Sequence, residues 1–581
     1  MPRTFRLALA QINPTVGDIT GNTAKIIEYL ERAREARADL VAFPELAITG
    51  YPPEDLLFKP SFLMDNLAAM ERVAAASQGI AVLVGYVGVE PDISNAAGLA
   101  YDGTLVDTYR KMYLPNYGVF DEDRYFRKGD ECPVYVINGV RVGVGICEDI
   151  WYPVGPMAVQ REAGAELVIN INASPFHAGK GEQREKMIAT RAADNELFVA
   201  YLNAVGGQDE LVFDGASTVY DMSGSLVARG AAFEEELIIT DLAIETVFSS
   251  RLRDPRPRKE NPTILREIGA SKLVHVSDQG SHGRIPLPVE PLEPMLGPLE
   301  EVYRALVLGT HDYLAKTGFT KAVIGLSGGV DSALTATVAV DALGPKNVVG
   351  VAMPSRYSSE GSISDAAELA ATLGIELLTV PIEPAHIAFA DMLEPYFRDT
   401  EPNVAEENVQ SRIRGNVLMT LSNKFSWIVL TTGNKSEMAM GYATLYGDMA
   451  GGFAVLKDVP KTLVYRLCEW RNKHGEPKNP ISKATIEKPP SAELKEGQID
   501  QDSLPPYDLL DPVVKAYVEE DISYEEMVAK GFDPKIVAQV ISSVDRNEYK
   551  RRQAPPGVKI TPRAFGKDRR LPIVNRYRQV G

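Results

Sequence analysis

The sequence predicts an α/β protein with a layered α/β domain in its first half and a doubly wound parallel sheet in its second half. Short apolar runs alternate with amphipathic helical segments along both halves, and a proline-rich stretch separates the two series. The chain has 581 residues, and a prior of about 150 residues per domain gives two to four domains. These three observations indicate two separately folded α/β parts.

The first half, residues 1–245, starts with a strand predicted at residues 5–10 and a helix at residues 21–38. Ile26, Ile27 and Leu30 lie on one face of that helix at helical spacing. Polar groups at the strand ends of such a layered domain often carry function. Further strands are predicted at residues 40–43, 81–85, 141–146, 167–172 and 198–203.

Three reactive side chains follow strands or lie in loops of this half. Glu45 ends DLVAFPE, Lys111 lies in YRKMYLPNYGVFDE, and Cys147 ends VRVGVGIC. A single cysteine at the end of an apolar strand is more often a packed small hydrophobe. Together, however, a carboxylate can take the thiol proton, an ammonium can favour the thiolate and stabilise an oxyanion, and the thiolate can attack a carbonyl. The three residues therefore predict an acyl-transfer site.

Histidine is the alternative base, because Cys–His pairs are common among thiol enzymes. His177 is the only histidine in residues 1–245, and its surroundings, PFHAGKG, are typical of a surface turn. We therefore expect it to be a solvated loop residue.

The segments FPELAITGYPPEDL and GICEDIW, with the Lys111 loop between them, resemble the nitrilase-type carbon–nitrogen hydrolases over most of residues 1–240. This resemblance implies an αββα sandwich in which Glu45 is the general base, Lys111 stabilises the oxyanion and Cys147 is the nucleophile. LPNYGVFDE is similar to the glutaminase branch that feeds NAD synthetases. By that resemblance the glutamine-binding residues are Tyr117, Ser174, Lys180 and Glu148, the last beside the nucleophile.

Residues 246–296 differ in composition from both halves. RLRDPRPRKENP is basic and interrupted by prolines, and IPLPVEPLEPMLGP has five prolines in 14 residues. Proline-rich segments resist helix and sheet and act as semi-rigid spacers. The sequence therefore predicts a linker and a domain boundary here.

The second half, residues 297–546, again alternates strands and helices, beginning with an amphipathic helix at residues 298–317. Such alternation predicts a doubly wound parallel sheet whose ligand crevice lies at the carboxyl ends of the strands. Strands are predicted at residues 348–353, 376–381 and 427–432, and helices at residues 362–373, 385–396 and 404–424.

The stretch KAVIGLSGGVDSAL, residues 321–334, has the order strand, glycine loop, helix. Backbone N–H groups of such a loop and the helix N-terminus can bind a phosphate. The Gly-Lys-Ser/Thr ending of a Walker A loop is missing, so we expect the pyrophosphate end of ATP as the ligand, with Asp331 available for magnesium. The alternative is a glycine turn with no ligand.

Three later segments, TTGNKSEMAMGY, VPKTLVYRL and KPPSAEL, place polar groups near the predicted crevice. Each alone could be a turn, a cap or a surface charge. With the glycine loop they resemble the ATP-pyrophosphatase module of NAD synthetases over most of the second half. That resemblance implies a magnesium site at Asp331 and Glu437. It also implies ATP contacts from Gly325, Leu326, Ser327, Gly328, Gly329, Val330, Asp331, Ser332, Thr432, Lys461 and Ser491.

The same resemblance implies deamido-NAD contacts from Asn408, in EENVQSRIRG, and from Glu437. Residues 547–581 are predicted as a basic C-terminal tail within an acidic chain. Lys550 is our candidate for a substrate contact from this tail, and a solvated charged tail is the alternative.

The formal net charge is −18, which argues against nucleic acid or an anionic membrane as a partner. Three cysteines, Cys132, Cys147 and Cys468, indicate a reducing compartment without a disulfide framework. Gln11, Asn13 and Pro14 interrupt the first apolar patch before a signal sequence could form, and no apolar run reaches about 18 residues. We therefore expect a cytoplasmic protein.

Together the halves resemble glutamine-dependent NAD(+) synthetases, which are ligases that form a C–N bond (EC 6.3.5.1). The resemblance implies that glutamine supplies ammonia, that ATP with Mg²⁺ adenylates deamido-NAD, and that a homodimer or larger homo-oligomer forms through the second domain. One alternative is another glutamine-dependent amidotransferase–ligase with a different adenylated acceptor. Another is a regulatory scaffold, which the presence of all three acyl-transfer residues disfavours.

Overall fold

The structure is a computed structural model that describes residues 3–253, 265, 267–278, 285–288 and 291–579. The chain divides into two compact units. The N-terminal unit comprises Met1–Gln208 and Val212–Leu296, and the C-terminal unit comprises Asp209–Leu211 and Gly297–Gly581. Among the described residues no helix is both long enough and apolar enough to cross a membrane.

The N-terminal unit contains two large sheets, which pack on a shared core of buried apolar side chains from both. The six-stranded sheet has the order β14 (Glu236–Ala243), β1 (Thr4–Gln11), β2 (Leu40–Ala42), β3 (Ala81–Gly88), β4 (Ser94–Tyr101) and β5 (Thr104–Arg110). The seven-stranded sheet has the order β13 (Leu226–Arg229), β12 (Thr218–Tyr220), β9 (Phe198–Asn203), β8 (Leu167–Asn172), β7 (Val140–Ile146), β6 (Glu131–Ile137) and β15 (Ala270–Ser277).

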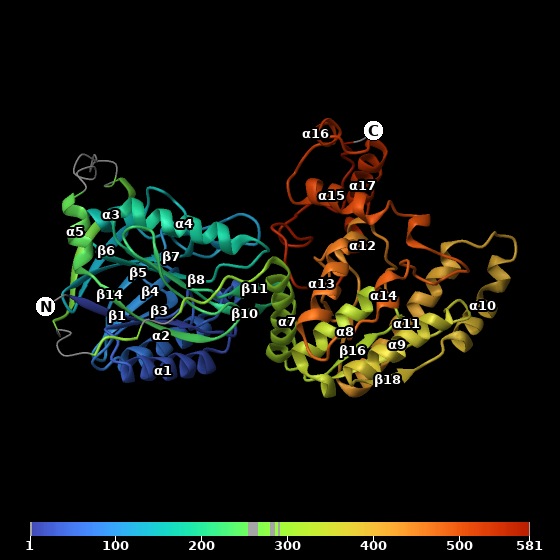
Figure 1. Cartoon of the computed structure of the whole chain (residues 1–581), viewed down its shortest axis with the longest axis horizontal. Coiled ribbons are helices and arrows are strands. Elements are labelled where there is room, and N and C mark those ends of the chain that lie inside the picture. Colours follow the sequence, from blue (N-terminus) through green and yellow to red (C-terminus); the bar gives the residue numbers. More distant parts are fainter. Residues whose placement is uncertain (1–2, 254–264, 266, 279–284, 289–290, 580–581) are drawn as a thin grey trace. The chain divides into compact units, whose positions relative to one another are not determined.

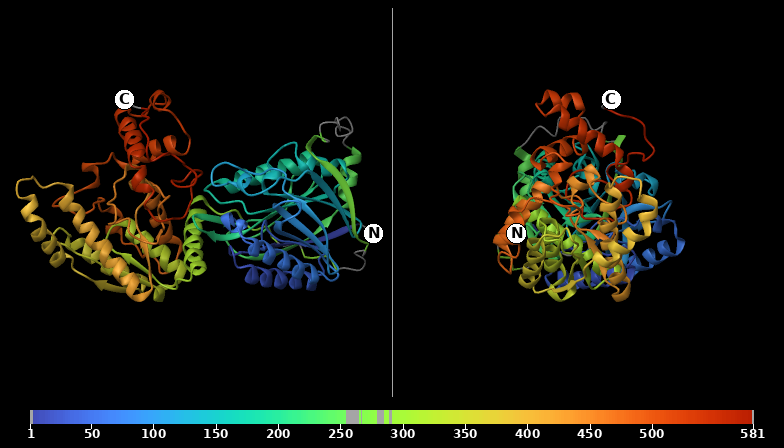
Figure 2. Two further views of the ribbon diagram at one scale, coloured as in Figure 1. Left: turned by 180° about the vertical axis from the view of Figure 1, so that it is seen from behind. Right: turned by 90° about the vertical axis from the view of Figure 1, so that its right-hand side faces the viewer.

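Helices cover the outer faces of both sheets and complete an αββα sandwich, as predicted. Helices α1 (Ile19–Glu35) and α2 (Pro60–Ala75) contact strands of the six-stranded sheet, and α3 (Pro156–Glu162) and α4 (Lys180–Asn195) contact the seven-stranded sheet. The two helix pairs lie on opposite sides of the sheets in Figure 1 and, seen from behind, in Figure 2. A small hairpin is formed by β10 (Val205–Gln208) and β11 (Leu211–Asp214).

The central strands β7, β8 and β9 run parallel, which brings their carboxyl ends to one edge of the sheet. All residues of β8 and β9 are buried. Strands buried on both faces favour continuous apolar runs over alternation, and this is why the sequence predicts these two strands with their correct bounds.

The linker predicted at residues 246–296 contains regular structure. Helix α5 (Glu245–Arg253) begins before it, and β15 pairs in parallel with β6 at the edge of the seven-stranded sheet. The composition of the flanking residues led us to expect a spacer. The alternating run ASKLVHVS instead forms a strand that pairs with β6, whose outer backbone groups would otherwise be unpaired at the edge of the sheet. Much of RLRDPRPRKENP lies outside the described residues, and the described residues of 285–296 have no helix or strand.

The C-terminal unit is built on a five-stranded sheet in which every pairing is parallel. Its order is β18 (Glu376–Thr379), β17 (Val348–Ala352), β16 (Ala322–Gly325), β19 (Ile428–Thr431) and β20 (Phe453–Ala454). After β16 the chain adds β17 and then β18 on one side of it, and it then returns to add β19 and β20 on the other side. With right-handed crossovers, α8 (Val330–Leu343) and α9 (Glu360–Leu373) lie on one face, and α10 (Glu383–Phe397) and α11 (Val404–Phe425) lie on the other. This is the predicted doubly wound fold.

Strand order reverses between β16 and β19, so a topological switch point lies beside the glycine loop that follows β16. The remaining helices of the unit surround this region or form an adjoining helical cluster with its own apolar core. They are α7 (Pro298–Thr317), α12 (Lys435–Met440), α13 (Lys461–His474), α14 (Lys483–Glu487), α15 (Tyr507–Val518), α16 (Tyr524–Ala529), α17 (Pro534–Arg546) and α18 (Glu548–Arg551).

The residues after α17 do not form a solvated tail throughout. Val558 and Ile560 are buried, and Asp458 accepts hydrogen bonds from the backbone N–H groups of Ile560 and Thr561, at 2.9 and 2.7 Å. These buried contacts were not predicted, because the basic composition of residues 547–581 indicates a solvated tail. Because the contacts hold the segment against the C-terminal unit, Lys550 has a defined place in this unit.

Candidate active sites

Cys147 occupies a strained turn at the carboxyl end of β7. Its φ is +44°, and it begins a 3₁₀ turn that continues to Ile150. A left-handed conformation costs a residue other than glycine on the order of 1–2 kcal/mol, so the surrounding structure must hold it. The side chain is 3% exposed. The turn thus places the thiol at the carboxyl end of β7.

Lys111 lies between two carboxylates at the same edge. Its Nζ is 2.8 Å from Glu45 Oε1 and 2.8 Å from Glu122 Oε1, and the side chains of Lys111 and Glu45 are fully buried. Asn95 Nδ2 and the Ala173 backbone N–H also donate to Glu45, at 2.7 and 2.9 Å. Three groups that are distant from Glu45 in the sequence thus fix the position of its carboxylate.

Burial and charge decide how protons are distributed in this site. Burial, and then the negative charge of Glu45, raise the pKa of Cys147 well above its ordinary value, although Lys111 lowers it. Glu122 and Glu45 raise the pKa of Lys111 despite its burial. Lys111 thus favours the thiolate, as predicted, but burial and Glu45 outweigh its effect and the thiol keeps its proton at rest. A base must take the proton as the sulfur attacks.

The predicted glutamine-binding residues form two hydrogen-bonded pairs. Tyr117 donates its hydroxyl to Glu148 Oε2 at 2.9 Å, and Lys180 Nζ donates to Ser174 Oγ at 2.9 Å. Glu148 directly follows the nucleophile, and Ser174 directly follows Ala173, whose N–H binds Glu45. Tyr117 is 59% exposed, whereas Ser174 is buried. His177 Nδ1 lies 3.2 Å from the carbonyl of its neighbour Ala178.

Two members of this site were missed in the sequence. Glu122 ends the segment LPNYGVFDE, so a motif marked the place but did not single out the second carboxylate. Burial and nearby Glu45 raise the pKa of Glu122 to about 7, although Lys111 opposes that shift. Asn95 lies on β4 and has no signal of its own, because the pairing of β2 with β3 and of β3 with β4 is what brings it to Glu45.

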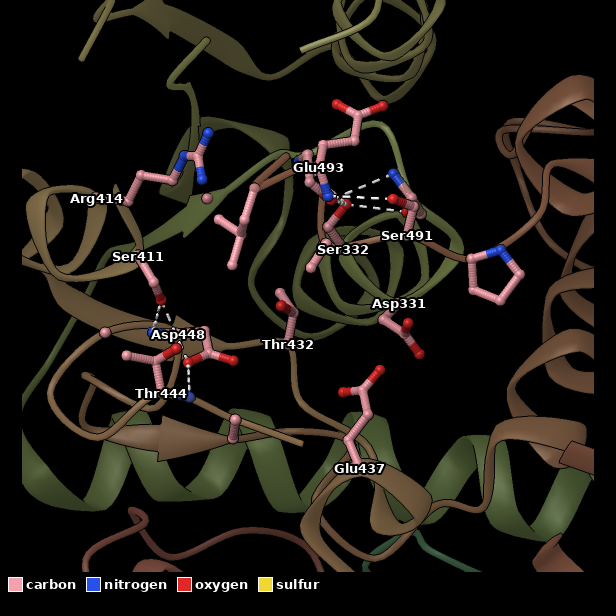
Figure 3. Close-up of a pocket in the computed structure, with 18 of the residues that line it drawn as sticks. Asp331, Ser332, Ser411, Arg414, Thr432, Glu437, Thr444, Asp448, Ser491 and Glu493 are labelled. Atoms are coloured by element: carbon pink, nitrogen blue, oxygen red, sulfur yellow. Dashed lines mark hydrogen bonds between the residues drawn. The ribbon is translucent and has the colours of Figure 1, made fainter. Parts of the chain in front are cut away.

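The C-terminal unit has a pocket of about 560 Å³ at the switch point. Every ATP-binding and deamido-NAD-binding position predicted from the sequence lines it, except Gly328. The pocket walls include the carboxyl ends of β16, β17 and β19, where a doubly wound sheet binds ligands. Figure 3 shows Asp331 and Glu437 facing one another, with Thr432 near them.

Gly328 contributes backbone geometry to this loop. Its φ is +74°, and a Cβ atom there would lie 2.3 Å from the carbonyl oxygen of Ser362, in the first turn of α9. Only glycine fits both constraints. The loop then leads directly into α8, whose N-terminal N–H groups are suited to an anion.

Two residues bridge the carboxylates of Asp331 and Glu437. Lys461 Nζ contacts Asp331 Oδ2 and lies 3.7 Å from Glu437 Oε1. Asn434 Nδ2 donates to Asp331 Oδ1 at 3.1 Å, and Asn434 Oδ1 accepts from the Glu437 N–H at 3.0 Å. Burial and nearby Asp331 raise the pKa of Glu437 to about 8.

This donor set fits magnesium. Mg²⁺ in proteins is commonly held by one or two carboxylates together with phosphate oxygens of a substrate, and Asp331 and Glu437 face the pocket beside the phosphate-binding loop. Among the described residues no group of three or more metal-ligating side chains is placed to bind a metal without such help.

The other predicted contacts in the pocket already have partners within the chain. Thr444 Oγ1 donates to Asn408 Oδ1 at 2.7 Å. Lys550 Nζ donates to the carbonyl of Gly441 at 2.7 Å, and burial lowers its pKa. The hydroxyl of Ser491 accepts from the backbone N–H of Glu493 at 3.1 Å within its own loop. Asn434 and Arg414, which the sequence analysis quoted but did not select, also belong to this region: Arg414 lines the pocket.

Comparison with known families matches each unit separately. The family described as NAD synthase matches residues 302–554, and the family described as carbon–nitrogen hydrolase matches residues 6–251. The glycine loop and the carboxylate pair lie in the first match, and Glu45, Lys111 and Cys147 lie in the second.

Relatives with both units align along the whole chain. A glutamine-dependent NAD(+) synthetase from Thermotoga maritima is 49% identical over 586 residues, covering 99% of this chain and 100% of that protein. The enzyme of the same name from Aquifex aeolicus is 46% identical over 576 residues, with 99% and 100% coverage. The chain belongs to the glutamine-dependent NAD(+) synthetase family.

Solved structures agree with this assignment to the NAD(+) synthetase family. The glutamine-dependent NAD(+) synthetase from Acinetobacter baumannii, in complex with adenosine diphosphate, is 39% identical, covers 99% of both chains and has a TM-score of 0.74. A family member from Cytophaga hutchinsonii, 21% identical, has a TM-score of 0.80 with 98% coverage of both chains and shares the fold.

The geometry around Lys111 predicts a pH dependence for glutamine hydrolysis. Below about pH 7 Glu122 is protonated, and Lys111 Nζ has one fewer charged partner. As the pH rises through about 7, Glu122 ionises, and its carboxylate, 2.8 Å from Lys111 Nζ, holds the ammonium where we expect it to stabilise the oxyanion, so glutamate release should increase. Glu122→Gln should abolish this increase.

Glutamate release measured across this pH range, in the unchanged chain and in E122Q, checks the prediction. Ammonia-dependent NAD synthesis by the same two proteins is the control, and its pH profile should be the same in both. An increase near pH 7 that survives in E122Q would assign it to another group.

Proposed function

We propose that the N-terminal unit hydrolyses glutamine at Glu45, Lys111 and Cys147, and that the C-terminal unit uses the ammonia to convert deamido-NAD to NAD. The observation that supports this most is the presence in one chain of a buried Glu–Lys pair beside a strained cysteine and of an SGGVDS pocket with a carboxylate pair. The first arrangement suits acyl transfer, and the second suits chemistry on a nucleoside triphosphate.

In the first reaction Glu45 takes the thiol proton as Cys147 Sγ attacks the side-chain amide carbon of glutamine. The oxygen of that amide gains negative charge, which Lys111 Nζ stabilises. When the C–N bond breaks, Glu45 returns the proton to the departing nitrogen, so ammonia and a glutamyl thioester form. Water then attacks the thioester with Glu45 as base, and glutamate and the free thiol are released.

Glutamine recognition is assigned to the two hydrogen-bonded pairs beside the nucleophile. Glu148 directly follows Cys147 and accepts the hydroxyl of Tyr117, and Ser174 and Lys180 follow Ala173, whose N–H binds Glu45. A carboxylate and an ammonium suit the α-amino and α-carboxylate groups of glutamine respectively. Lys180 is, after Lys111, the second ammonium group that we assign to this site, and its hydrogen bond to Ser174 holds it in place.

In the second reaction the nicotinate carboxylate of deamido-NAD attacks the α-phosphorus of ATP. Pyrophosphate leaves, an adenylate forms, and ammonia then displaces AMP to give NAD. The loop of residues 325–332 holds the departing phosphates on its backbone and the N-terminus of α8. Lys461 offsets part of the growing negative charge. Thr432 and Ser491 complete the ATP contacts, and Asn408, Glu437 and Lys550 hold deamido-NAD.

Asp331 and Glu437 are proposed to hold Mg²⁺, which when bound neutralises charge on the phosphates of ATP. Their own contribution is to face the phosphate loop from two elements, α8 and α12. Asn434 and Lys461 keep the two side chains together.

The identity of the acceptor separates this proposal from a synthetase that adenylates another carboxylate. The test is to incubate the protein with glutamine, ATP, Mg²⁺ and deamido-NAD, and to omit each in turn. We expect NAD, AMP, pyrophosphate and glutamate only from the complete mixture. Release of AMP with another carboxylate, and none with deamido-NAD, would favour the alternative.

Cys147→Ala tests the nucleophile. Without Sγ no thioester forms, so glutamine-dependent NAD synthesis should fall by about 10⁴-fold or more, in the range seen for loss of a catalytic nucleophile. Synthesis from ammonium should stay within about twofold of the unchanged chain, because the C-terminal site is intact. NAD formation from each nitrogen source gives both values.

The ammonium arm is the control for folding of the C-terminal unit. If C147A still used glutamine at the original rate, the assignment of the nucleophile would be wrong. If both nitrogen sources failed, the variant would be checked by thermal unfolding, and Cys147→Ser would replace it.

Asp331→Asn tests the magnesium pair. Loss of one carboxylate should lower adenylate formation by about 10²-fold or more, several kcal/mol of the barrier, and raise the Mg²⁺ concentration needed for half-maximal rate. Pyrophosphate release measured against Mg²⁺ concentration gives both quantities. Glutamine hydrolysis by the same protein is the control and should be unchanged, and an unaltered Mg²⁺ dependence would remove Asp331 from the metal site.

We also propose that the chain forms a homodimer through the C-terminal unit, with α10 at the interface. No residue of α10 is buried within the chain, yet the helix carries exposed apolar side chains: Ile387, Phe389, Met392, Tyr396 and Phe397. Met392 is 60% exposed and Tyr396 is 80% exposed. An apolar surface of this kind on one helix is typical of an interface between copies.

The double change Ile387→Asp and Met392→Asp should convert the oligomer to a smaller species, because it places two charges in an apolar contact. Sedimentation velocity measures this. Val574→Asp is the control, since Val574 is 95% exposed and lies outside α10. An unchanged sedimentation coefficient in the double variant would exclude α10 as the interface.

A further inference from the structure

Asp149 is a buried carboxylate that the proposed reaction does not use. It lies two residues after Cys147 and is 2% exposed. Four donors bind its two oxygens: the Tyr109 hydroxyl at 2.7 Å, and the backbone N–H groups of Ile146 at 2.9 Å, Tyr113 at 3.0 Å and Met112 at 3.1 Å. Four hydrogen bonds fill the acceptor capacity of an ionised carboxylate in its plane.

The donors belong to two segments that carry the proposed catalytic groups. Ile146 immediately precedes Cys147 at the end of β7, and Met112 and Tyr113 immediately follow Lys111 at the end of β5. Strands β5 and β7 belong to different sheets of the N-terminal unit. Asp149 is therefore a direct link between the nucleophile turn and the lysine loop across the two sheets.

The electrostatics of Asp149 favour a carboxylate over a neutral acid at this place. Burial raises its pKa to about 6, while the bonds from Tyr109 and from the backbone N–H groups of Ile146 and Tyr113 lower it. At neutral pH the group is therefore mostly ionised. An amide in the same position would turn an NH₂ group toward at least one of these N–H donors, because one of its two polar atoms cannot accept.

The link through Asp149 helps to hold the strained turn at Cys147. Cys147 is held at positive φ, and its direct neighbour Ile146 is anchored through its N–H to Asp149. On the other side, Asp149 takes the N–H groups of the two residues after Lys111. If the anchor is lost, the turn can relax and the ammonium and the thiol can move apart, although each remains in the protein.

We propose that Asp149 is a positioning residue for glutamine hydrolysis, which holds Cys147 Sγ and Lys111 Nζ at their working separation by joining the two segments that carry them. This inference rests on the roles proposed above for Cys147 and Lys111. Asp149 acts through its hydrogen bonds to the Tyr109 hydroxyl and to the backbone of the two segments. A misplacement of about 1 Å can lower an enzymatic rate by about 10²-fold, so the expected effect is large.

Asp149→Asn in the full-length protein tests the proposal, because it keeps the size of the side chain and removes one acceptor. We expect glutamine hydrolysis to fall by about 10²-fold, with ammonia-dependent NAD synthesis unchanged. Alkylation of Cys147 by a chloroketone analogue of glutamine, followed by mass spectrometry, should slow by a similar factor. A purely structural role would lower the melting temperature and leave this alkylation rate of the folded protein unaltered.

Asp39→Asn is the matched control. Asp39 is also 2% exposed in the N-terminal unit, and it accepts from the Arg6 backbone N–H at 2.7 Å and from Asn138 Nδ2 at 2.6 Å. It bonds to neither of the two segments by these contacts. We expect D39N to lower stability while the alkylation rate and the rate of glutamine hydrolysis in the folded protein remain as in the unchanged chain.

Tyr109→Phe is the second variant, in case D149N does not fold. It removes only the hydroxyl donor and leaves the three backbone donors, so we expect a smaller loss of glutamine hydrolysis, in the same direction for alkylation.

The outcomes separate the two proposals. If C147A loses glutamine use while D149N and Y109F hydrolyse glutamine and react with the chloroketone like the unchanged chain, Asp149 has no positioning role and the nucleophile assignment stands. If C147A retains glutamine use, the proposed function itself fails. Equal slowing of alkylation in D149N and D39N would also overturn the inference, since loss of stability would then explain both.

Discussion

The N-terminal site depends on one buried ammonium shared by two carboxylates. Lys111 has no exposed surface, and without Glu45 and Glu122 its charge would be expensive to bury. Burial, and then the negative charge of Glu45, raise the pKa of the neighbouring thiol, so the thiol keeps its proton at rest. In the proposed reaction, proton transfer to a carboxylate is therefore part of the attack. The fold supports this by bringing together residues on or after β2, β4 and β5 of one sheet and β7 and β8 of the other.

In the C-terminal site, as in the N-terminal site, a buried ammonium group lies between two carboxylates. Lys461 lies between Asp331 and Glu437, and Asn434 links the same two side chains. In the N-terminal unit the shared ammonium is proposed to stabilise charge on the amide oxygen of glutamine. In the C-terminal unit it lies in a pocket with the glycine loop, where we propose that a divalent cation and the lysine offset the charge of a nucleotide. The unit thus has acidic and basic groups that are balanced for a ligand bearing several negative charges.

Much of the fold, and the position of many candidate site residues, could be predicted from the sequence because these residues follow strongly apolar strands. Glu45, Cys147 and the SGGVDS loop each follow such a run, so their neighbourhood is local in the sequence. Glu122, Asn95 and Asn434 were not singled out because their roles come from distant pairings: Asn95 meets Glu45 through the β2–β3 and β3–β4 pairings, and Asn434 meets Asp331 across the switch point. Strand β15 was missed for a related reason, since its partner β6 lies far earlier in the chain.

The state of the Cys147 thiol has a consequence for the protein in an oxidising environment. Peroxides attack thiolates, and susceptibility follows ionisation and exposure. Cys147 is buried, and Glu45 and its burial hold its pKa well above the ordinary value. The proposed nucleophile is therefore mostly a thiol at rest, the form that reacts poorly with small oxidants. The same charge arrangement that makes the base necessary thus protects the cysteine from irreversible oxidation between turnovers.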